Sequence, residues 1–188
     1  MRAIYLLGSA LVIAMAPCAQ AKDPLTILGI PLGQPFTVPA CATNPDGSPD
    51  FSRTCWTPLY DQADMKNLWY NGDPVIGHGI IAHVHDGILT TLTFETQGIK
   101  NEDYVMGKLV EKFGKPNHFV KEPMQNGFGA QFYVYRAEWD NASVYVKYDA
   151  DADDGTPDSG WIIIETAQWH SKEEAARAQY LKDHPSTL

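Results

Sequence analysis

The chain has 188 residues, of which 44% are apolar and 20% charged, and its formal net charge is −9. This composition predicts a folded globular protein, because disordered chains carry fewer apolar residues, and collagen or a coiled coil carries a repeat that the sequence lacks. At this length a single domain is expected. The acidic balance argues against nucleic acid as a partner, since phosphates are bound by surfaces rich in lysine and arginine.

The first 21 residues have the features of an export signal. Arg2 is followed by the apolar run Ile4 to Ala16, and Ala19-Gln20-Ala21 has the small-x-small pattern that a signal peptidase accepts. The run is too short to span a membrane, and no later segment is longer. We therefore expect a periplasmic or secreted protein that begins after Ala21. Cys18 is expected to leave with the signal, because the proline before it does not fit the site of lipid attachment.

Two cysteines, Cys41 and Cys55, remain after this cleavage. An even pair in an exported chain predicts a disulfide, and the segment between them is rich in turn residues. A redox pair or a metal site is disfavoured, because CxxC spacing is absent and two thiolates alone make a poor zinc site. We expect residues 22–74 to form an arm with the disulfide loop, within the same domain as an α+β core over residues 75–188.

The predicted elements begin with a proline-interrupted segment. Residues 25–38 predict an edge strand or a covering arm, because proline removes a ladder donor. The sequence of residues 57–74 does not indicate one type of secondary structure. Two β-branched runs, 75–85 and 88–95, are then joined by Asp86-Gly87, which predicts a hairpin with a type I′ turn.

A central helix follows the hairpin. Asn101 is a suitable N-cap, and Gly114 stops the helix. Val105, Leu109 and Phe113 recur at helical spacing and predict one apolar face toward the sheet.

Further strands and a last helix complete the chain. The helix is expected to open at a capping box formed by Ser171 and Glu174. The strands are predicted near residues 118–122, 128–139, 142–149 and 161–166. This order predicts an α+β fold: an antiparallel sheet built from hairpins, with one central helix packed on a face and a C-terminal helix.

Histidines provide the first candidate metal site. His83 and His85 lie two apart in a predicted strand, so both side chains point to one face. With Asp86 they could bind zinc or copper, since neutral imidazole is a good ligand for both. Alternatively, they are the solvent-facing residues of a hairpin whose even-numbered positions are buried.

An acidic loop provides the second candidate metal site. Asp149, Asp151 and Asp153 alternate, as oxygen ligands do in calcium loops. Asp154 stands where an EF-hand needs glycine, which excludes an EF-hand. The alternatives are a calcium loop of another kind and a solvated acidic turn.

Aromatic and acidic side chains provide candidate partner-binding residues. Tyrosines on neighbouring strands can form a binding platform, although such rows more often stiffen a sheet as cross-strand pairs. The remaining candidates lie in the acidic loop and beside the turn at Met124–Phe128. The candidate set is Tyr133, Tyr135, Tyr145, Asp153, Asp154, Asp158 and Phe128.

These observations favour binding over catalysis. The mature sequence has no G-x-S-x-G, no glycine-rich phosphate loop after a strand, and no free cysteine once the disulfide forms. We therefore expect no enzyme activity and no cofactor. The leading hypothesis is an exported acidic protein that binds a protein partner with a basic surface, as an inhibitor or immunity-type protein. The alternatives are a metal-binding protein or metalloenzyme that uses zinc or calcium, and a structural envelope protein.

Overall fold

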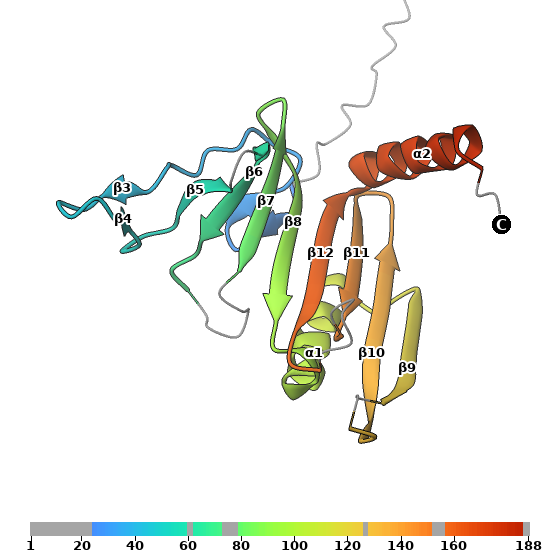
Figure 1. Cartoon of the computed structure of the whole chain (residues 1–188). Coiled ribbons are helices and arrows are strands. Elements are labelled where there is room, and N and C mark those ends of the chain that lie inside the picture. The colour runs from blue at the N-terminus through green and yellow to red at the C-terminus, as the bar shows by residue number, and fades with distance from the viewer. Residues whose placement is uncertain (1–23, 60–61, 73–78, 126–127, 152–156, 186–188) are drawn as a thin grey trace, which may run out of the picture.

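The computed structural model describes residues 24–59, 62–72, 79–125, 128–151 and 157–185. The expected export signal and Cys18 lie outside the described residues. The fold is an eight-stranded antiparallel sheet in the order β5-β6-β7-β8-β12-β11-β10-β9, which confirms the α+β prediction (Figure 1). The strands are β5 (Cys55–Leu59), β6 (Gln62–Trp69), β7 (Ile80–His85), β8 (Ile88–Thr96), β9 (His118–Gln125), β10 (Gln131–Asp140), β11 (Val144–Asp149) and β12 (Gly160–Thr166).

The hairpin between β7 and β8 forms where the sequence predicts it. Asp86 and Gly87 have φ angles of 50° and 79°, the left-handed values that a type I′ turn requires at both central positions. The register of this pair shifts because His83 pairs with Thr91 and Val84 with Leu89, so Thr90 forms a β-bulge in β8, opposite the strand that carries both candidate histidines. β7 begins at Ile80, and the first part of the predicted strand lies mostly outside the described residues.

The central helix is confirmed as α1 (Glu102–Phe113), which a short 3-10 turn (Gly98–Lys100) precedes. It ends at Gly114, whose φ of 80° suits a residue without a Cβ atom. Val105 and Leu109 are buried against the sheet, as the helical spacing predicts. Asn101 is the N-cap residue, as predicted, although its side chain makes no cap hydrogen bond; its backbone oxygen accepts from Val105 N.

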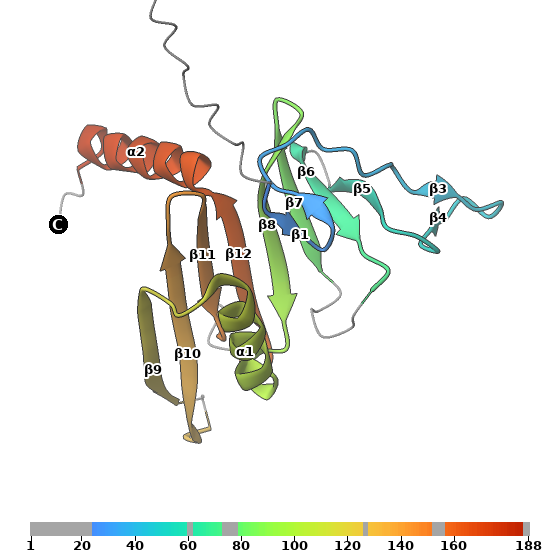
Figure 2. The same ribbon diagram turned by 180° about the vertical axis from the view of Figure 1, so that it is seen from behind.

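The N-terminal arm covers the same face of the sheet as α1 (Figure 2). Its strands β1 (Thr26–Ile27) and β2 (Ile30–Pro31) pair only with each other, and Ile27, Ile30 and Leu32 are buried in the core. The segment is thus a covering arm that also pairs with the sheet beyond β2, since Gly33 N donates to Leu89 O and Leu89 N donates to Gln34 O. A second small hairpin, β3 (Ala42–Thr43) with β4 (Pro49–Asp50), lies inside the disulfide loop.

The Cys41–Cys55 disulfide is confirmed, with an S–S distance of 2.01 Å. Cys55 is fully buried and begins β5. The ambiguous residues 57–74 contain most of β5 and β6, and β6 pairs with β7, so the sheet continues past the disulfide loop without interruption.

The C-terminal helix α2 (Ala167–Asp183) corrects the predicted start at Ser171 and Glu174. β12 runs directly into it, and Thr166 is the N-cap, because its side chain accepts a hydrogen bond from Trp169 N. The Ser171 hydroxyl instead donates to Ala167 O inside the helix.

α2 projects from the upper end of β12 and buries none of its residues (Figure 1). Its apolar residues Ala175, Ala178 and Leu181 are all exposed. Among the described residues, no helix is long and apolar enough to cross a membrane.

Candidate functional site on the open face of the sheet

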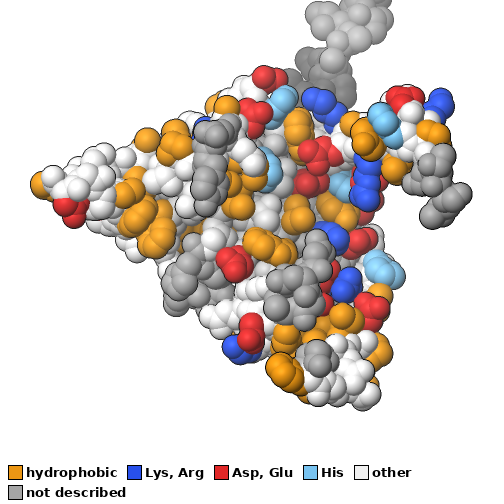
Figure 3. Space-filling view, viewed as in Figure 1, with side chains coloured by type: hydrophobic (Ala, Val, Ile, Leu, Met, Phe, Trp, Pro, Cys, Tyr) orange, Lys and Arg blue, Asp and Glu red, His pale blue; other side chains and the backbone are white. Residues whose placement is uncertain are grey.

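One face of the sheet is not covered by α1 or by the arm. Strand register places a defined set of side chains there, because residues paired across neighbouring strands share a face. We call this set the open face, and it is turned toward the viewer in Figure 3. It includes Met65, Asn67, Ile81, His83, Thr91, Thr93, Glu95, His118, Val120, Glu122, Met124, Phe132, Val134, Arg136, Glu138, Asp140, Tyr145, Lys147, Asp149, Trp161, Ile163 and Glu165.

The middle of the open face is apolar and its border is charged. Ile81, Trp161 and Ile163 are half-buried side chains on β7 and β12. Carboxylates on β8, β9, β10, β11 and β12 surround them, and Arg136 and Lys147 are the cations within the set. An apolar centre with a polar border is the arrangement found at protein interfaces.

Arg136 holds two carboxylates at the β9–β10–β11 side of this face. Its Nε lies 3.2 Å from Glu122 Oε2, and its Nη1 lies 3.5 Å from Asp149 Oδ2. Asp149 also accepts a hydrogen bond from the backbone N of Asp151 at 3.2 Å. Both aspartates are buried. Asp149, predicted as a calcium ligand, is thus engaged by protein groups, whereas Asp153 lies outside the described residues.

Glu165 and His170 join the sheet to the first turn of α2. Glu165 Oε2 lies 3.0 Å from His170 Nδ1, and the His170 ring stacks on Tyr145 at a centroid distance of 3.6 Å. Burial raises the pKa of the Glu165 carboxyl. Burial and the nearby Glu138 and Glu165 raise the pKa of Tyr145 to about 12, so its phenol is neutral at pH 7. Glu165 and His170 therefore hold the first turn of α2 against the sheet, and the Tyr145 hydroxyl beside them is not ionised.

Glu165 gives this part of the fold a pH dependence. Because its folded-state pKa is raised, the folded protein binds the Glu165 proton more tightly than the unfolded chain does. As pH rises from the ordinary glutamate pKa through the raised one, the free energy of unfolding should fall for the wild type. Glu165→Gln removes this contribution. Urea unfolding from pH 4 to pH 7 should show the wild type losing stability relative to Glu165→Gln as pH rises; the opposite trend would mean that pairing with His170 outweighs burial.

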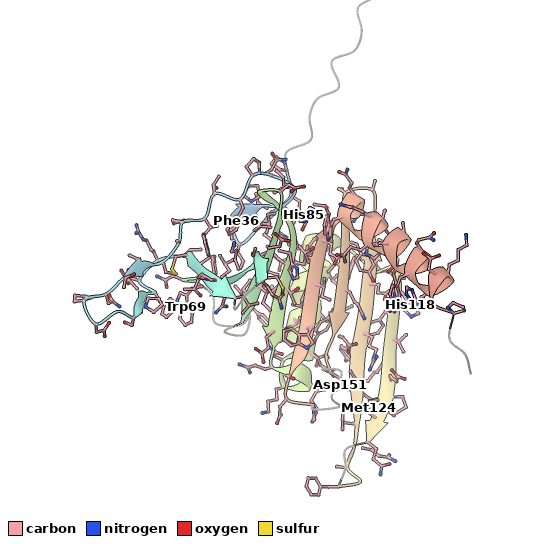
Figure 4. The ribbon with its side chains drawn as sticks, turned by 45° about the horizontal axis from the view of Figure 1, so that its top comes forward. Phe36, Trp69, His85, His118, Met124 and Asp151 are labelled. Atoms are coloured by element: carbon pink, nitrogen blue, oxygen red, sulfur yellow. A yellow bond between two sulfur atoms is a disulfide. The ribbon has the colours of Figure 1, made fainter. Side chains whose placement is uncertain are left out.

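The two candidate histidines line one hollow of about 390 Å³ at the upper end of β7. His85 Nδ1 lies 4.0 Å from Asp64 Oδ2, and His85 Nε2 lies 3.6 Å from Asp86 Oδ2. The His85 ring also packs against Trp169 of α2, with 4.7 Å between centroids. Figure 4 labels His85 in this position. The sequence prediction that both histidines face one way agrees with this arrangement.

The other walls of the hollow come from distant parts of the chain. They include Met65 of β6 and Trp169 of α2, which no sequence pattern connects with the histidines. Within the described parts of the chain, no group of three His, Cys, Asp or Glu side chains is placed to hold one metal ion.

The tyrosines predicted as one platform lie on opposite faces of the sheet. Tyr145 is on the open face, whereas Tyr133 and Tyr135 share the α1 face with Ala137 and Trp139. Tyr133 is 56% exposed, and Lys121 lies over both rings of the Tyr133–Tyr135 pair.

The remaining predicted partner-binding residues are dispersed. Phe128 is fully exposed beside the β9–β10 turn. Asp158 forms an ion pair with Lys100 at 2.9 Å. Asp154, like Asp153, lies outside the described residues. The structure therefore does not gather the predicted set into one surface, because alternate residues of β10 and β11 point to different faces.

Comparison of the chain with protein-family models, with curated proteins and with solved structures finds no match.

Proposed function

We propose that this protein is exported and binds another protein through the open face of its sheet. The observation that supports this most strongly is the half-buried apolar strip of Ile81, Trp161 and Ile163, bordered by carboxylates on the one face that neither α1 nor the arm covers. The sheet supplies a rigid surface, because each of its eight strands is hydrogen-bonded to its neighbours. Rigid surfaces bind with little ordering of the backbone.

The charges on this face favour a basic partner. Six carboxylates of the open face stand against two cations, Arg136 and Lys147, and the whole chain carries a formal charge of −9. An acidic field speeds the capture of a basic protein and weakens as salt is added. Basic exported enzymes, such as cell-wall hydrolases and nucleases, fit this description, and an inhibitor or immunity-type role would follow from covering their active sites.

An exported location fits this proposal. The Cys41–Cys55 disulfide is compatible with an oxidising compartment, where such bonds persist. The sequence features of residues 1–21 are the other support for export.

Charge reversal at the border of the open face should weaken partner binding. Glu95 and Asp140 are exposed carboxylates of β8 and β10, and neither forms a salt bridge in the described structure. The double variant Glu95→Lys/Asp140→Lys should bind purified basic exported proteins at least about tenfold more weakly than the wild type at low salt, mainly through a slower association rate. Surface plasmon resonance at two salt concentrations measures both quantities.

The matched control reverses two exposed carboxylates of α1, on the other face. Asp103→Lys/Glu111→Lys changes the net charge equally, and melting temperatures of both variants establish that each is folded. Equal weakening by both pairs would mean that net charge, not the open face, attracts the partner. The proposal would be contradicted if the wild type bound none of a panel of basic exported proteins, taken from the organism that makes the chain, at low salt.

A further inference from the structure

We propose that the hollow between β6, β7 and α2 is a Cu(I) site, with the imidazoles of His83 and His85 and the thioether of Met65 as ligands. This site is separate in chemistry from the proposed protein-binding role, although it lies at the upper border of the same face. It adds a third ligand that the spacing of the two histidines does not reveal.

The strand register brings the three ligands together. Met65 on β6 is the direct partner of His83 on β7, and directly opposed residues have Cβ atoms about 4.5–5.5 Å apart. His83 and His85 are separated by one residue on the same strand, and all three side chains line the same hollow. A β-bulge at Thr90 of β8 lies beside His83, and the Thr90 hydroxyl donates to His83 O at 3.2 Å; bulges are common beside functional sites.

The ligand types select a soft metal ion. Calcium prefers oxygen donors, and zinc prefers imidazole, thiolate and carboxylate, so a thioether is a poor ligand for both. Thioether and imidazole together suit Cu(I).

The surroundings of the hollow support a bound cation. Asp64 Oδ2 lies 4.0 Å from His85 Nδ1 and Asp86 Oδ2 lies 3.6 Å from His85 Nε2, both beyond hydrogen-bond length. A metal on either ring nitrogen therefore leaves one carboxylate beside the other nitrogen to orient the ring. Trp169 packs on the His85 ring and covers the site from α2, and it contributes an aromatic surface to the hollow. The His85 side chain is 40% exposed, so a metal can enter from solvent.

The test is a metal titration of the full-length exported chain. Ag(I), a redox-inert substitute for Cu(I), is titrated by calorimetry, and Cu(I) is titrated without oxygen, with ascorbate, against a coloured Cu(I) chelator. We expect one equivalent of each ion to bind. Met65→Leu and His83→Gln should each weaken binding by about 100-fold or more, because even the loss of an outer-shell partner typically weakens a site by about 10–100-fold. Zn(II) should bind more weakly than Cu(I).

Two variants on β9 are matched controls. Met124→Leu and His118→Ala remove the same kinds of donor from the same sheet at the opposite edge, and Figure 4 labels both positions. Both should leave Cu(I) and Ag(I) affinity unchanged. Met65→Leu conserves volume and keeps the test valid if His83→Gln fails to fold.

Three results would overturn the site. The first is no stoichiometric Cu(I) or Ag(I) binding by the wild type. The second is undiminished affinity in Met65→Leu, which would remove the thioether from the ligand set. The third is Zn(II) binding tighter than Cu(I). None of these results depends on whether a protein partner binds the open face, so the two proposals fail independently.

Discussion

Trp139→Ala should lower the free energy of unfolding by about 3–5 kcal/mol, the largest effect that we expect from one substitution. Trp139 is 1% exposed on the α1 face of β10, and its ring lies 6.4 Å from that of Phe113 at the end of α1. Its indole Nε1 donates a 2.7 Å hydrogen bond to Gly114 O. The variant therefore leaves a large cavity and an unpaired carbonyl where the helix ends on the sheet. Urea unfolding followed by circular dichroism measures the change.

Phe128→Ala is the matched aromatic control. Its side chain is fully exposed, so we expect a change within about 0.5 kcal/mol. If Trp139→Ala cost no more than this control, the contact between α1 and β10 would not be part of the core. Trp139→Phe should fall between the two, because it keeps most of the apolar volume and loses the hydrogen bond.

Removal of the disulfide should lower the free energy of unfolding by about 3 kcal/mol. The bond closes a loop with a sequence separation of 14, and its loss enlarges the conformational freedom of the unfolded chain. Cys55 is also fully buried at the start of β5, where Trp56 N donates to Pro39 O and Cys41 N donates to Trp56 O. Thermal or urea unfolding of Cys41→Ser/Cys55→Ser measures the loss.

Wild-type protein whose disulfide has been reduced with a thiol is the control for the serine substitutions. It should lose a similar stability without introducing hydroxyl groups into the buried site of Cys55. An unchanged midpoint in both samples would show that the arm and β5 are held by their hydrogen bonds alone.

Local sequence signals predicted those elements whose chemistry lies within a few residues. Asp86-Gly87 specified its turn through the left-handed backbone angles that only a few residue types accept, and Gly114 specified the end of α1 in the same way. β6 was missed because its sequence mixes lysine, aspartate and asparagine with few β-branched residues, and its strand conformation depends on pairing with β5 and β7.

The start of α2 was misplaced for a related reason. The local sequence predicts that Thr166 ends an apolar strand and that Ser171 and Glu174 form a capping box. The helix begins earlier, because Trp169 and His170 pack on His85 and Tyr145, contacts with strands far away in the sequence. Tertiary packing thus overrides the local cap.

The candidate sites show the same division between local and distant information. The pairing of His83 with His85 follows from strand periodicity alone. Their neighbours Met65 and Trp169 follow only from the pairing of β6 with β7 and from the position of α2. Likewise, the acidic open face assembles from carboxylates on β8 to β12, whose sharing of one face depends on register across the whole sheet.

Carboxylate footprinting of the protein–partner complex tests the central claim most directly. The free and bound protein are labelled with a water-soluble carbodiimide and an amine, and each modified residue is quantified by mass spectrometry. The open face as binding surface predicts strong protection of Glu95, Glu122 and Asp140 in the complex, with Asp103 and Glu111 of α1 labelled as before. Protection of the α1 carboxylates, with the open face still labelled, would contradict it.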